Sequence, residues 1–209
     1  MRFDIHIHTD ISPCSSMSIG TIIETAKARG LDGICLTDHN SMDALLSVSE
    51  GLQNNGICVI VGVEYDTPAG DYLLFGPFSD LAWASGLDTA HILARLRDRG
   101  GIAIAAHPFR KDRSVPEYII AQGLCAAVER YNGRNSGDEN SAVEPWVSRY
   151  NPVLCGGSDA HEPHEIASYC TDIDADITGR DDFINAVKSG KCVPVIGAGS
   201  EGRAPIFCK

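Results

Sequence analysis

The sequence predicts an α/β fold in which strands are joined by crossover helices, arranged either as a barrel or as a doubly wound sheet. Short apolar runs alternate with amphipathic segments, which is typical of parallel strands that are each followed by a helix. Histidines and carboxylates come directly after several of these runs, at the carboxyl ends of the predicted strands. In a parallel barrel all these ends lie on one face, so distant side chains would meet in one pocket. With 209 residues, 44% of them hydrophobic, the chain fits one domain over residues 1–209.

Four apolar runs in the first part of the chain predict strands, at residues 2–7, 33–37, 57–63 and 72–75. The run over 57–63 is unbroken, which indicates burial on both faces. A helix is expected between Ser18 and Gly30, because apolar residues recur there at helical spacing and glycine favours the conformation that ends helices. A second helix is expected over residues 42–53, before a turn at Asn54-Asn55-Gly56.

The second part of the chain repeats this alternation. A helix is expected from Asp88 or Thr89, either of which can cap it, to Arg99 before a Gly-Gly pair. Further strands are expected at residues 102–106, 124–128 and 152–155, followed by a last helix between Thr178 and Gly190. The polar segment over residues 132–145 is expected to be a flexible active-site loop.

Composition limits the classes of partner. The formal net charge of -11 and the pI near 4.9 argue against an extended nucleic acid, because few basic residues are available to neutralise phosphates. We therefore expect a small phosphorylated substrate. The sequence contains no apolar stretch long enough to cross a membrane and no signal-peptide pattern, which predicts a cytoplasmic protein. The eight cysteines form no Cys-x-x-Cys pair and are expected to be free thiols.

Seven histidines and carboxylates near the predicted strand exits are candidate metal ligands: His6, His8, His39, Glu64, His107, Asp159 and His161. His6 and His8 lie two residues apart on a strand, so their side chains point to the same face. A single buried histidine is more often a hydrogen-bonded core residue, but the joint occurrence of this set favours a metal site. Imidazole and carboxylate ligands together suit zinc, manganese or iron, whereas magnesium prefers oxygen ligands alone.

These motifs resemble those of the PHP (polymerase and histidinol phosphatase) domain family of metal-dependent phosphoesterases, and the match covers nearly the whole chain. The matching motifs are, in order, His6-x-His8-Thr9, Thr37-Asp38-His39, Glu64, His107-Pro108 and Ser158-Asp159-x-His161. The resemblance implies a free-standing enzyme with a distorted (β/α)7 TIM-like barrel and two or three divalent metal ions. It also implies that one ion is held by His6, His8, Glu64 and Asp159, that His39 and His107 serve another, and that His161 completes the set.

The chain departs from the family at Cys14, where many members carry an aspartate or a histidine that helps to hold a further ion. A thiolate at this position could bind a soft metal, or the thiol could simply be a neighbouring side chain. Glu129, which follows a predicted strand, is the candidate for a further ligand, with Asn132 a weaker one. An ordinary ion pair is the alternative role for Glu129.

Three residues are candidates for direct roles in catalysis. Asp38 could bind metal, orient His39 or transfer a proton, and the orienting role is favoured. Arg110 comes shortly after His107 and is expected to hold phosphate oxygens with its planar guanidinium. Arg134, on the predicted loop, could close over the substrate. Lys111 and Arg113 are less certain neighbours, since each could be a solvated surface charge.

The expected function is hydrolysis of a small phosphomonoester or nucleotide-type phosphoester by a metal-bound hydroxide. Bound ions would lower the pKa of a bridging water toward about 7, so no protein nucleophile is required. A metal-dependent exonuclease that degrades oligonucleotides is the main alternative. A non-catalytic binding protein would be expected to lack some of the ligands. Hydrolysis of C–N bonds is a further possibility, although no lysine occupies a position suited to bridging two ions after carboxylation.

Overall fold

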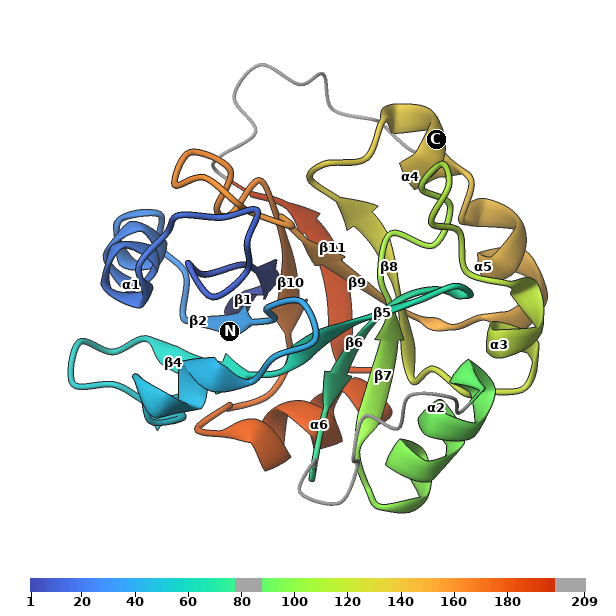
Figure 1. Cartoon of the computed structure of the whole chain (residues 1–209), viewed down its shortest axis with the longest axis horizontal. Helices are drawn as coiled ribbons and strands as arrows, with labels where there is room; N and C mark the ends of the chain where they lie inside the picture. Colours follow the sequence, from blue (N-terminus) through green and yellow to red (C-terminus); the bar gives the residue numbers. More distant parts are fainter. Residues whose placement is uncertain (78–87, 198–209) are drawn as a thin grey trace.

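The computed structural model describes residues 1–77 and 88–197, in which strands occupy the centre of the molecule and helices lie at its periphery (Figure 1). The helices are α1 (Ile19–Ala28), η1 (a 3-10 helix, Asp43–Leu46), α2 (Thr89–Asp98), α3 (Glu117–Ala121), α4 (Gly137–Ser141), α5 (Glu144–Tyr150) and α6 (Arg180–Lys188). The strands are β1 (Arg2–Ile7), β2 (Gly33–Leu36), β3 (Gly51–Leu52), β4 (Cys58–Val61), β5 (Val63–Thr67), β6 (Gly70–Phe75), β7 (Ile102–Ala105), β8 (Ala127–Asn132), β9 (Val153–Gly157), β10 (Tyr169–Ile173) and β11 (Cys192–Ile196). The predicted α/β class is confirmed.

The strands form two mixed sheets, with the orders β11-β10-β1-β2-β4-β3 and β5-β6-β7-β8-β9. Within them, β1, β2 and β4 are parallel, as are β7, β8 and β9, whereas the hairpins β5–β6 and β10–β11 are antiparallel. The expected closed TIM-like barrel is not confirmed, because the described strands do not form a single continuous parallel sheet. Isolated bridges, Ile7 to Ala160 and His39 to Glu64, connect the two sheets where β1 and β2 end.

The two sheets share a hydrophobic core. Phe3 and Ile5 of β1 belong to the same buried cluster as Leu73 and Phe75 of β6. Helix α6 adds Phe183, whose ring meets that of Phe75 edge to face with centroids 4.9 Å apart. Burying a side chain of this kind stabilises the fold by about 1.5–3 kcal/mol. The core therefore holds the strand ends, and the residues that follow them, in fixed positions.

The helices predicted before the strands at residues 33–37 and 102–106 are present. Helix α1 begins after Ser18, whose hydroxyl accepts a hydrogen bond from the backbone N–H of Thr21 at 3.1 Å, and it buries Ile22 and Ala26 against β2 and β4. Helix α2 buries Leu93 and Leu96. Local caps and apolar spacing were sufficient for both predictions.

Two predictions of local structure are wrong. The expected helix over residues 42–53 is replaced by η1 and by β3, which pairs with the edge of β4. The expected loop over 132–145 instead contains the end of β8, helix α4 and the start of α5. Ser136 and Glu139 form a capping box at the start of α4, and this Ser-x-x-Glu signal is visible in the sequence.

Other elements were not predicted, namely α3, β10, β11 and most of β5, since Glu64 was expected to follow a strand and instead lies within one. Strand β11 carries Pro194 and lies at a sheet edge, where a missing N–H is tolerated but the sequence signal is weak. The cysteines within the described residues are free, as predicted, and Cys208 lies outside them. Within the same residues, no helix combines the length and the apolar character needed to span a bilayer.

Candidate metal centre

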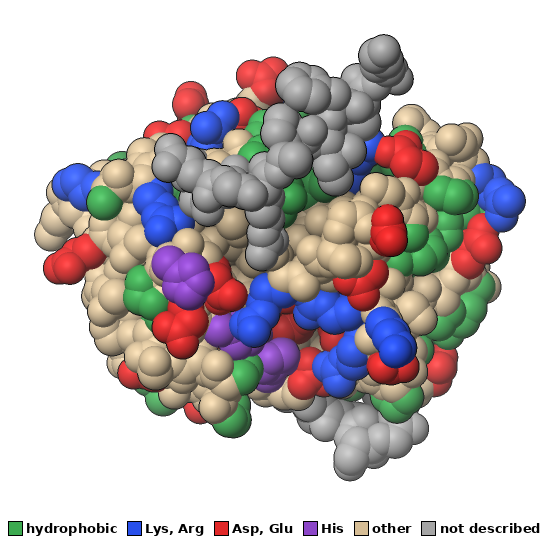
Figure 2. Space-filling view, turned by 90° about the horizontal axis from the view of Figure 1, so that it is seen from above, with side chains coloured by type: hydrophobic (Ala, Val, Ile, Leu, Met, Phe, Trp, Pro, Cys, Tyr) green, Lys and Arg blue, Asp and Glu red, His purple; other side chains and the backbone are tan. Residues whose placement is uncertain are grey.

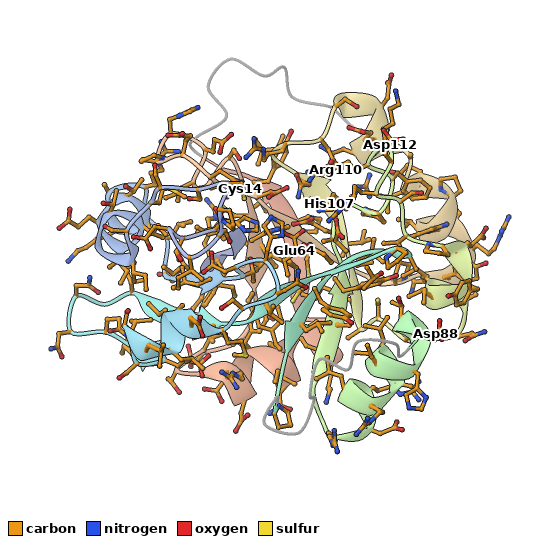
Figure 3. All side chains as sticks on the ribbon, viewed as in Figure 1. Cys14, Glu64, Asp88, His107, Arg110 and Asp112 are labelled. Atoms are coloured by element: carbon orange, nitrogen blue, oxygen red, sulfur yellow. The ribbon has the colours of Figure 1, made fainter. Side chains whose placement is uncertain are left out.

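The seven predicted ligands converge at the ends of strands from both sheets. His6 lies on β1 and His8 just beyond it, Glu64 lies on β5, and the others follow β2, β7 and β9. A cavity of about 280 Å³ opens here and is lined by Cys14, His39, Glu64, Asp71, His107, Arg110, Arg113, Arg134, Asp159 and His161. Four of these lining residues, Cys14, Glu64, His107 and Arg110, are labelled in Figure 3, and Figure 2 shows histidines and basic side chains gathered around a hollow on this face.

Local backbone features aim these side chains into the cavity. The pairing of β1 with β2 shifts register between Asp4 and Ile7, and the shift changes which residues face the interior. Ile5 therefore packs in the core between the sheets, whereas Ile7 packs in the cluster beneath α1. His107 and Asp159 have positive φ angles of 27° and 55°, a conformation that non-glycine residues seldom adopt and that is concentrated at functional sites.

A first, fully buried group consists of His6, His8, Glu64 and Asp159. The atoms that could bind a metal in this group lie within 4.8 Å of one another. The Nδ1 atom of His6 contacts the Glu129 carboxylate at 3.1 Å, and Nδ1 of His8 contacts the Ser12 hydroxyl at 3.2 Å. Ser12 uses its own proton to bond Asp38 at 2.6 Å, so His8 must donate to it. Both Nδ1 atoms therefore carry the proton of a neutral ring, and both Nε2 lone pairs face inward.

The inward-facing atoms of this group are all hydrogen-bond acceptors when the rings are neutral. The two Nε2 atoms lie 3.2 Å apart, and that of His8 is 3.1 Å from Glu64 Oε2 and 3.3 Å from Asp159 Oδ1. Among the described residues, Glu64 Oε2 has no hydrogen-bond partner. Such a set of acceptors is stable only with positive charge between them, supplied by added protons or by a metal cation. The donor set therefore fits a cation of the zinc, manganese or iron type.

A second group, which shares Glu64 with the first, consists of Glu64, Asp71 and His107. His107 Nε2 lies 2.9 Å from Glu64 Oε1 and 3.7 Å from Asp71 Oδ2. Asp71 was not predicted, because it reaches the site only through the β5–β6 hairpin, in which it pairs with Asp66. Asp66 was also missed, although its position two residues after Glu64 on one strand was an available signal.

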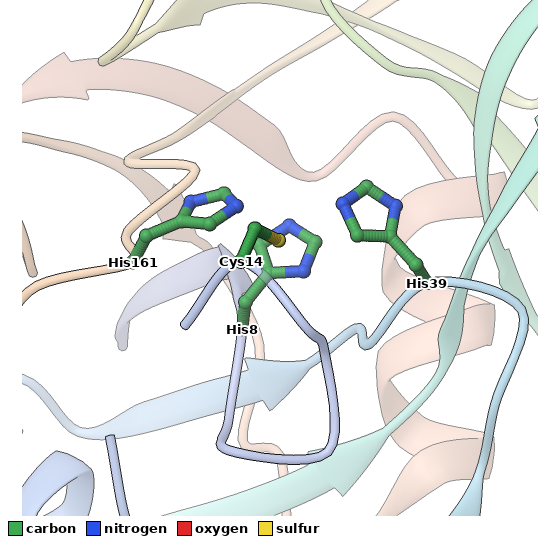
Figure 4. A group of neighbouring side chains, drawn as sticks. All are labelled: His8, Cys14, His39 and His161. Carbon is green, nitrogen blue, oxygen red and sulfur yellow. The ribbon is translucent and has the colours of Figure 1, made fainter. Parts of the chain in front are cut away.

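His8, Cys14, His39 and His161 form a third group, drawn in Figure 4, whose ligand atoms again lie within 4.8 Å of one another. Cys14 is exposed on the loop after β1. The His8 ring stacks on that of His161 with centroids 4.2 Å apart and lies 4.5 Å from that of His39. The structure thus brings Cys14 next to two of the predicted ligands from distant parts of the chain.

Burial and close charges shift the pKa values of these groups. Burial opposes ionisation of Glu64 and Asp159, but the neighbouring His6 and His8 outweigh it, so both carboxyl pKa values fall below their usual range. For His8, burial is outweighed by the adjacent carboxylates of Asp159 and Glu64, which raise its pKa to about 9. Burial and the charge of His8 lower the pKa of His161 to about 4. Burial also raises the pKa of the Cys14 thiol.

Glu129 is fully buried behind His6, outside all three groups. Its carboxylate accepts hydrogen bonds from the His107 backbone N–H and from the Asn132 side chain, both at 2.8 Å, in addition to its contact with the His6 ring. This arrangement orients the His6 ring and the His107 backbone. A direct bond from Glu129 to a metal stays a prediction.

Asp38 is buried beneath the loop that follows β1. It accepts hydrogen bonds from the backbone N–H and the hydroxyl of Thr9, each at 2.8 Å, and from Ser12. The ring of His39, which Asp38 was expected to orient, is instead contacted by Asp66 at 3.0 Å. Asp38 therefore acts on the site through Ser12, which contacts both the His8 ring and the His39 backbone N–H.

Three arginines border the cavity. Arg110 donates from Nε to Asn135 at 3.0 Å and from Nη2 to Asn132 at 2.8 Å and Asp159 at 2.7 Å, so its Nη1 edge is left for another acceptor. Arg113 grips Asp71 through two hydrogen bonds of 2.8 Å. The side chain of Arg134 is 42% exposed, and Glu165 lies 3.8 Å from it. Lys111 does not line the cavity.

Comparisons with known proteins agree with this geometry. A relative at 26% identity, the uncharacterized protein MJ0417 of Methanocaldococcus jannaschii, aligns over 90% of this chain and 79% of its own length. A two-domain protein from Bacteroides vulgatus, containing a predicted PHP-like metal-dependent phosphoesterase, superimposes with a TM-score of 0.73 at 19% identity, over 94% of this chain and 65% of that chain. The lesion-specific endonuclease PfuEndoQ from Pyrococcus furiosus gives a TM-score of 0.66 at 19% identity, over 90% and 56%. These structures show a shared fold.

Two family models match the sequence directly. The model of the PHP-associated region matches residues 137–192, and the model of the PHP domain matches residues 4–113, which is more than half of the chain. The match to the PHP domain includes the motifs that carry most of the candidate ligands. The chain therefore belongs to the PHP-domain family.

Proposed function

We propose that this protein is a metal-dependent phosphoesterase that hydrolyses a small phosphomonoester. The observation that carries the proposal is the convergence of buried acceptor atoms, which need positive charge between them, beside three arginines in one cavity. Metal-dependent phosphoester hydrolysis is the activity expected of a PHP-domain protein with an intact ligand set.

Two or three divalent ions, zinc, manganese or iron, would be held by His6, His8, His39, Glu64, His107, Asp159 and His161, with Asp71 as a further oxygen ligand. Bound cations would supply Lewis-acid activation of water and of the phosphoryl oxygens. The protein's own contribution is to fix the rings. Glu129, Asp66 and the carbonyl of Asp159 each contact the Nδ1 atom of one histidine and leave its Nε2 free to bind.

The arginines provide the remaining positive charge for a phosphoryl group. Arg110 bonds Asp159 through Nη2, which leaves its Nη1 for a phosphate oxygen, and a planar guanidinium suits such oxygens. We infer that Arg134, which lines the cavity and is partly exposed, contacts the part of the substrate that leaves. Preorganised donors of this kind stabilise the charge that develops in the transition state.

The cavity favours a compact, polar substrate. All its described lining residues are polar or ionisable, and none is a Phe, Tyr or Trp of the kind that usually stacks on a nucleobase. The volume of about 280 Å³ is also at the small end for ligand sites. A sugar phosphate or a similar small phosphomonoester fits these properties better than a nucleotide.

A nuclease is the second candidate, supported by the fold shared with the endonuclease PfuEndoQ. That likeness is one of fold at 19% identity, and the net charge of -11 opposes binding of a polyanion. The two functions predict different products, namely inorganic phosphate or released nucleotides.

The experiment is a hydrolysis assay of the wild-type chain on small phosphomonoesters, nucleoside monophosphates and single-stranded oligonucleotides, with manganese, zinc or iron. We expect phosphate release from a small phosphomonoester that a chelator abolishes. Arg134→Gln should raise KM for that substrate by about 10-fold, the effect of one hydrogen bond to a charged group, and Lys111→Gln should not. Metal-dependent cleavage of oligonucleotides alone would favour the nuclease, and no hydrolysis of either class would refute both.

A further inference from the structure

Three buried asparagines connect helix α4 to Arg110, the arginine that borders the cavity. Asn132 ends β8, Asn135 lies in the turn that follows, and Asn140 lies within α4, beyond the end of β8 in Figure 1. Their exposed fractions are 0%, 7% and 3%. A buried amide is costly unless its polar atoms are bonded, so the hydrogen bonds of these three side chains indicate what they hold in place.

Arg110 fixes the orientation of the first two amides. A guanidinium can only donate, so the Asn132 oxygen faces Nη2 at 2.8 Å and the Asn135 oxygen faces Nε at 3.0 Å. The NH2 group of Asn132 then donates to Glu129 at 2.8 Å. That of Asn135 donates to Oδ1 of Asn140 at 3.3 Å. Each amide therefore connects Arg110 to a buried acceptor behind it.

Asn140 closes this network from α4. Its Oδ1 atom also accepts a hydrogen bond from the backbone N–H of Asn132 at 3.0 Å, and its NH2 group donates to the Asn132 carbonyl at 3.2 Å. One side chain thus holds both backbone polar groups of Asn132. The neighbouring Glu139 accepts a hydrogen bond from the backbone N–H of Lys111 at 2.9 Å, so α4 also holds the residue next to Arg110.

The partners of Arg110 differ in charge from those of Arg113. Arg113 bonds the carboxylates of Asp71 and Asp66, which offset its charge. Arg110 bonds one carboxylate, that of Asp159, and two neutral amide oxygens, which restrict the guanidinium without offsetting its charge. Because Asp159 is also a candidate metal ligand, a bound cation would take up part of its negative charge and leave Arg110 available to an anion.

We propose that Asn140 is a positioning residue for phosphate binding, which acts through Asn132 and Asn135 to hold Arg110 toward the cavity that it lines. The inference rests on the phosphoesterase function proposed above and adds to it a role for α4, where the match to the PHP-associated region begins. Among the described residues, the side chain of Asn140 bonds Asn132 and Asn135. Replacing it should therefore loosen Arg110 without removing a candidate metal ligand.

The test is titration calorimetry of the full-length, manganese-loaded protein with inorganic phosphate, together with KM and kcat for the small phosphomonoester that it hydrolyses. We expect Asn140→Ala to weaken phosphate binding and raise KM by about 3- to 10-fold, the effect of one neutral hydrogen bond, with a smaller change in kcat. Manganese affinity should match that of the wild type. The control Glu50→Ala removes hydrogen bonds to Val61 and Arg180 outside the cavity and should change none of these values.

A double-mutant cycle separates positioning from general support. Because Asn140 acts through Arg110, Asn140→Ala should add no further loss of phosphate affinity to that of Arg110→Gln. Additive losses would overturn the proposal. So would a loss of manganese affinity as large as the loss of phosphate affinity, since Asn140 would then support the whole centre through Glu129.

The outcomes also separate this inference from the proposed function. If the wild type hydrolyses phosphoesters and Asn140→Ala keeps its KM and phosphate affinity, the positioning role alone is refuted. If Asn140→Ala does not fold, Asn135→Ala breaks the same connection at one bond and should show the same selective loss, and unchanged phosphate affinity in that variant refutes the role. If the wild type neither binds phosphate nor hydrolyses a phosphoester, both proposals fall.

Discussion

The two ends of β1 carry two cavities that differ in size and in chemistry. The cavity at the amino end is the larger, about 710 Å³, and its lining includes Arg2, Asp32, Asp172 and Lys191. There, Arg2 and Asp172 are exposed and pair through two hydrogen bonds of 2.7 and 2.8 Å. At the carboxyl end the cavity is smaller, about 280 Å³, but it gathers buried carboxylates and imidazoles, and Glu64 Oε2 has no hydrogen-bond partner among the described residues. The chemistry of the lining, and not the volume, therefore distinguishes the candidate functional end.

Matched aspartate substitutions at the two ends test this contrast most strongly. Asp159→Asn removes a carboxylate from the first group. Replacing a residue that only supports a metal ligand typically lowers activity by about 10- to 100-fold, so we expect a larger loss of kcat/KM in this variant. Asp172→Asn should leave kcat/KM unchanged. Phosphate release at saturating manganese or zinc measures both. Equal activities of the two variants would refute the assignment of the site.

Glu129→Gln should have the next largest effect, because it weakens the hydrogen bond that orients the His6 ring. Unlike Asp159→Asn, it leaves every side chain of the three candidate metal-binding groups in place. We expect a loss of about 10- to 100-fold in metal affinity, measured by titration calorimetry. Glu144→Gln, on the surface at the pair with Arg130, is the control and should bind metal as the wild type does. Unchanged affinity in Glu129→Gln would show that Glu129 is only a packing residue.

Two glycines offer a third comparison. A Cβ at Gly157 would lie 2.6 Å from Glu129 Oε1 and 2.7 Å from His6 Cβ, so Gly157→Ala must displace the site, at a cost of about 1–3 kcal/mol. Gly30, at the other end, has open space but a φ of 72°, so Gly30→Ala costs about 1–2 kcal/mol of backbone strain. Urea unfolding should find both variants destabilised, and metal titration should find only Gly157→Ala impaired. Normal metal affinity in Gly157→Ala would contradict the tight packing inferred here.

The smallest effect is expected at the surface pair of Arg2 and Asp172. The hydrogen bond from Arg2 lowers the pKa of Asp172, so the pair stabilises the folded state above the unfolded pKa of about 3.9 and is lost as the pH falls through the lower folded value. Because the pair is more than a third exposed, Asp172→Asn should cost no more than about 1 kcal/mol at pH 7. Urea unfolding at pH 7 and near pH 2 should show this difference shrink. A difference that grows at low pH would reverse the sign of the linkage.

The convergence of the candidate ligands could be predicted from the sequence, whereas the pairing of the strands could not. His107 directly follows an apolar run, and Asp159 follows another after a short Gly-Gly-Ser turn, so both were expected at strand exits. Asp71 could not be predicted, since it reaches Glu64 only through the register of an antiparallel hairpin, which is a tertiary property. The same hairpin, with that of β10 and β11, divides the expected single barrel into two mixed sheets. Local periodicity contains no information on such pairings.

Anomalous diffraction from crystals of the metal-loaded protein, recorded at the zinc and manganese edges, tests the central claim most directly. The account predicts peaks inside the smaller cavity, within bonding distance of His6, His8, Glu64 and Asp159. The absence of any peak in this cavity at saturating metal, or peaks confined to other parts of the surface, would contradict it.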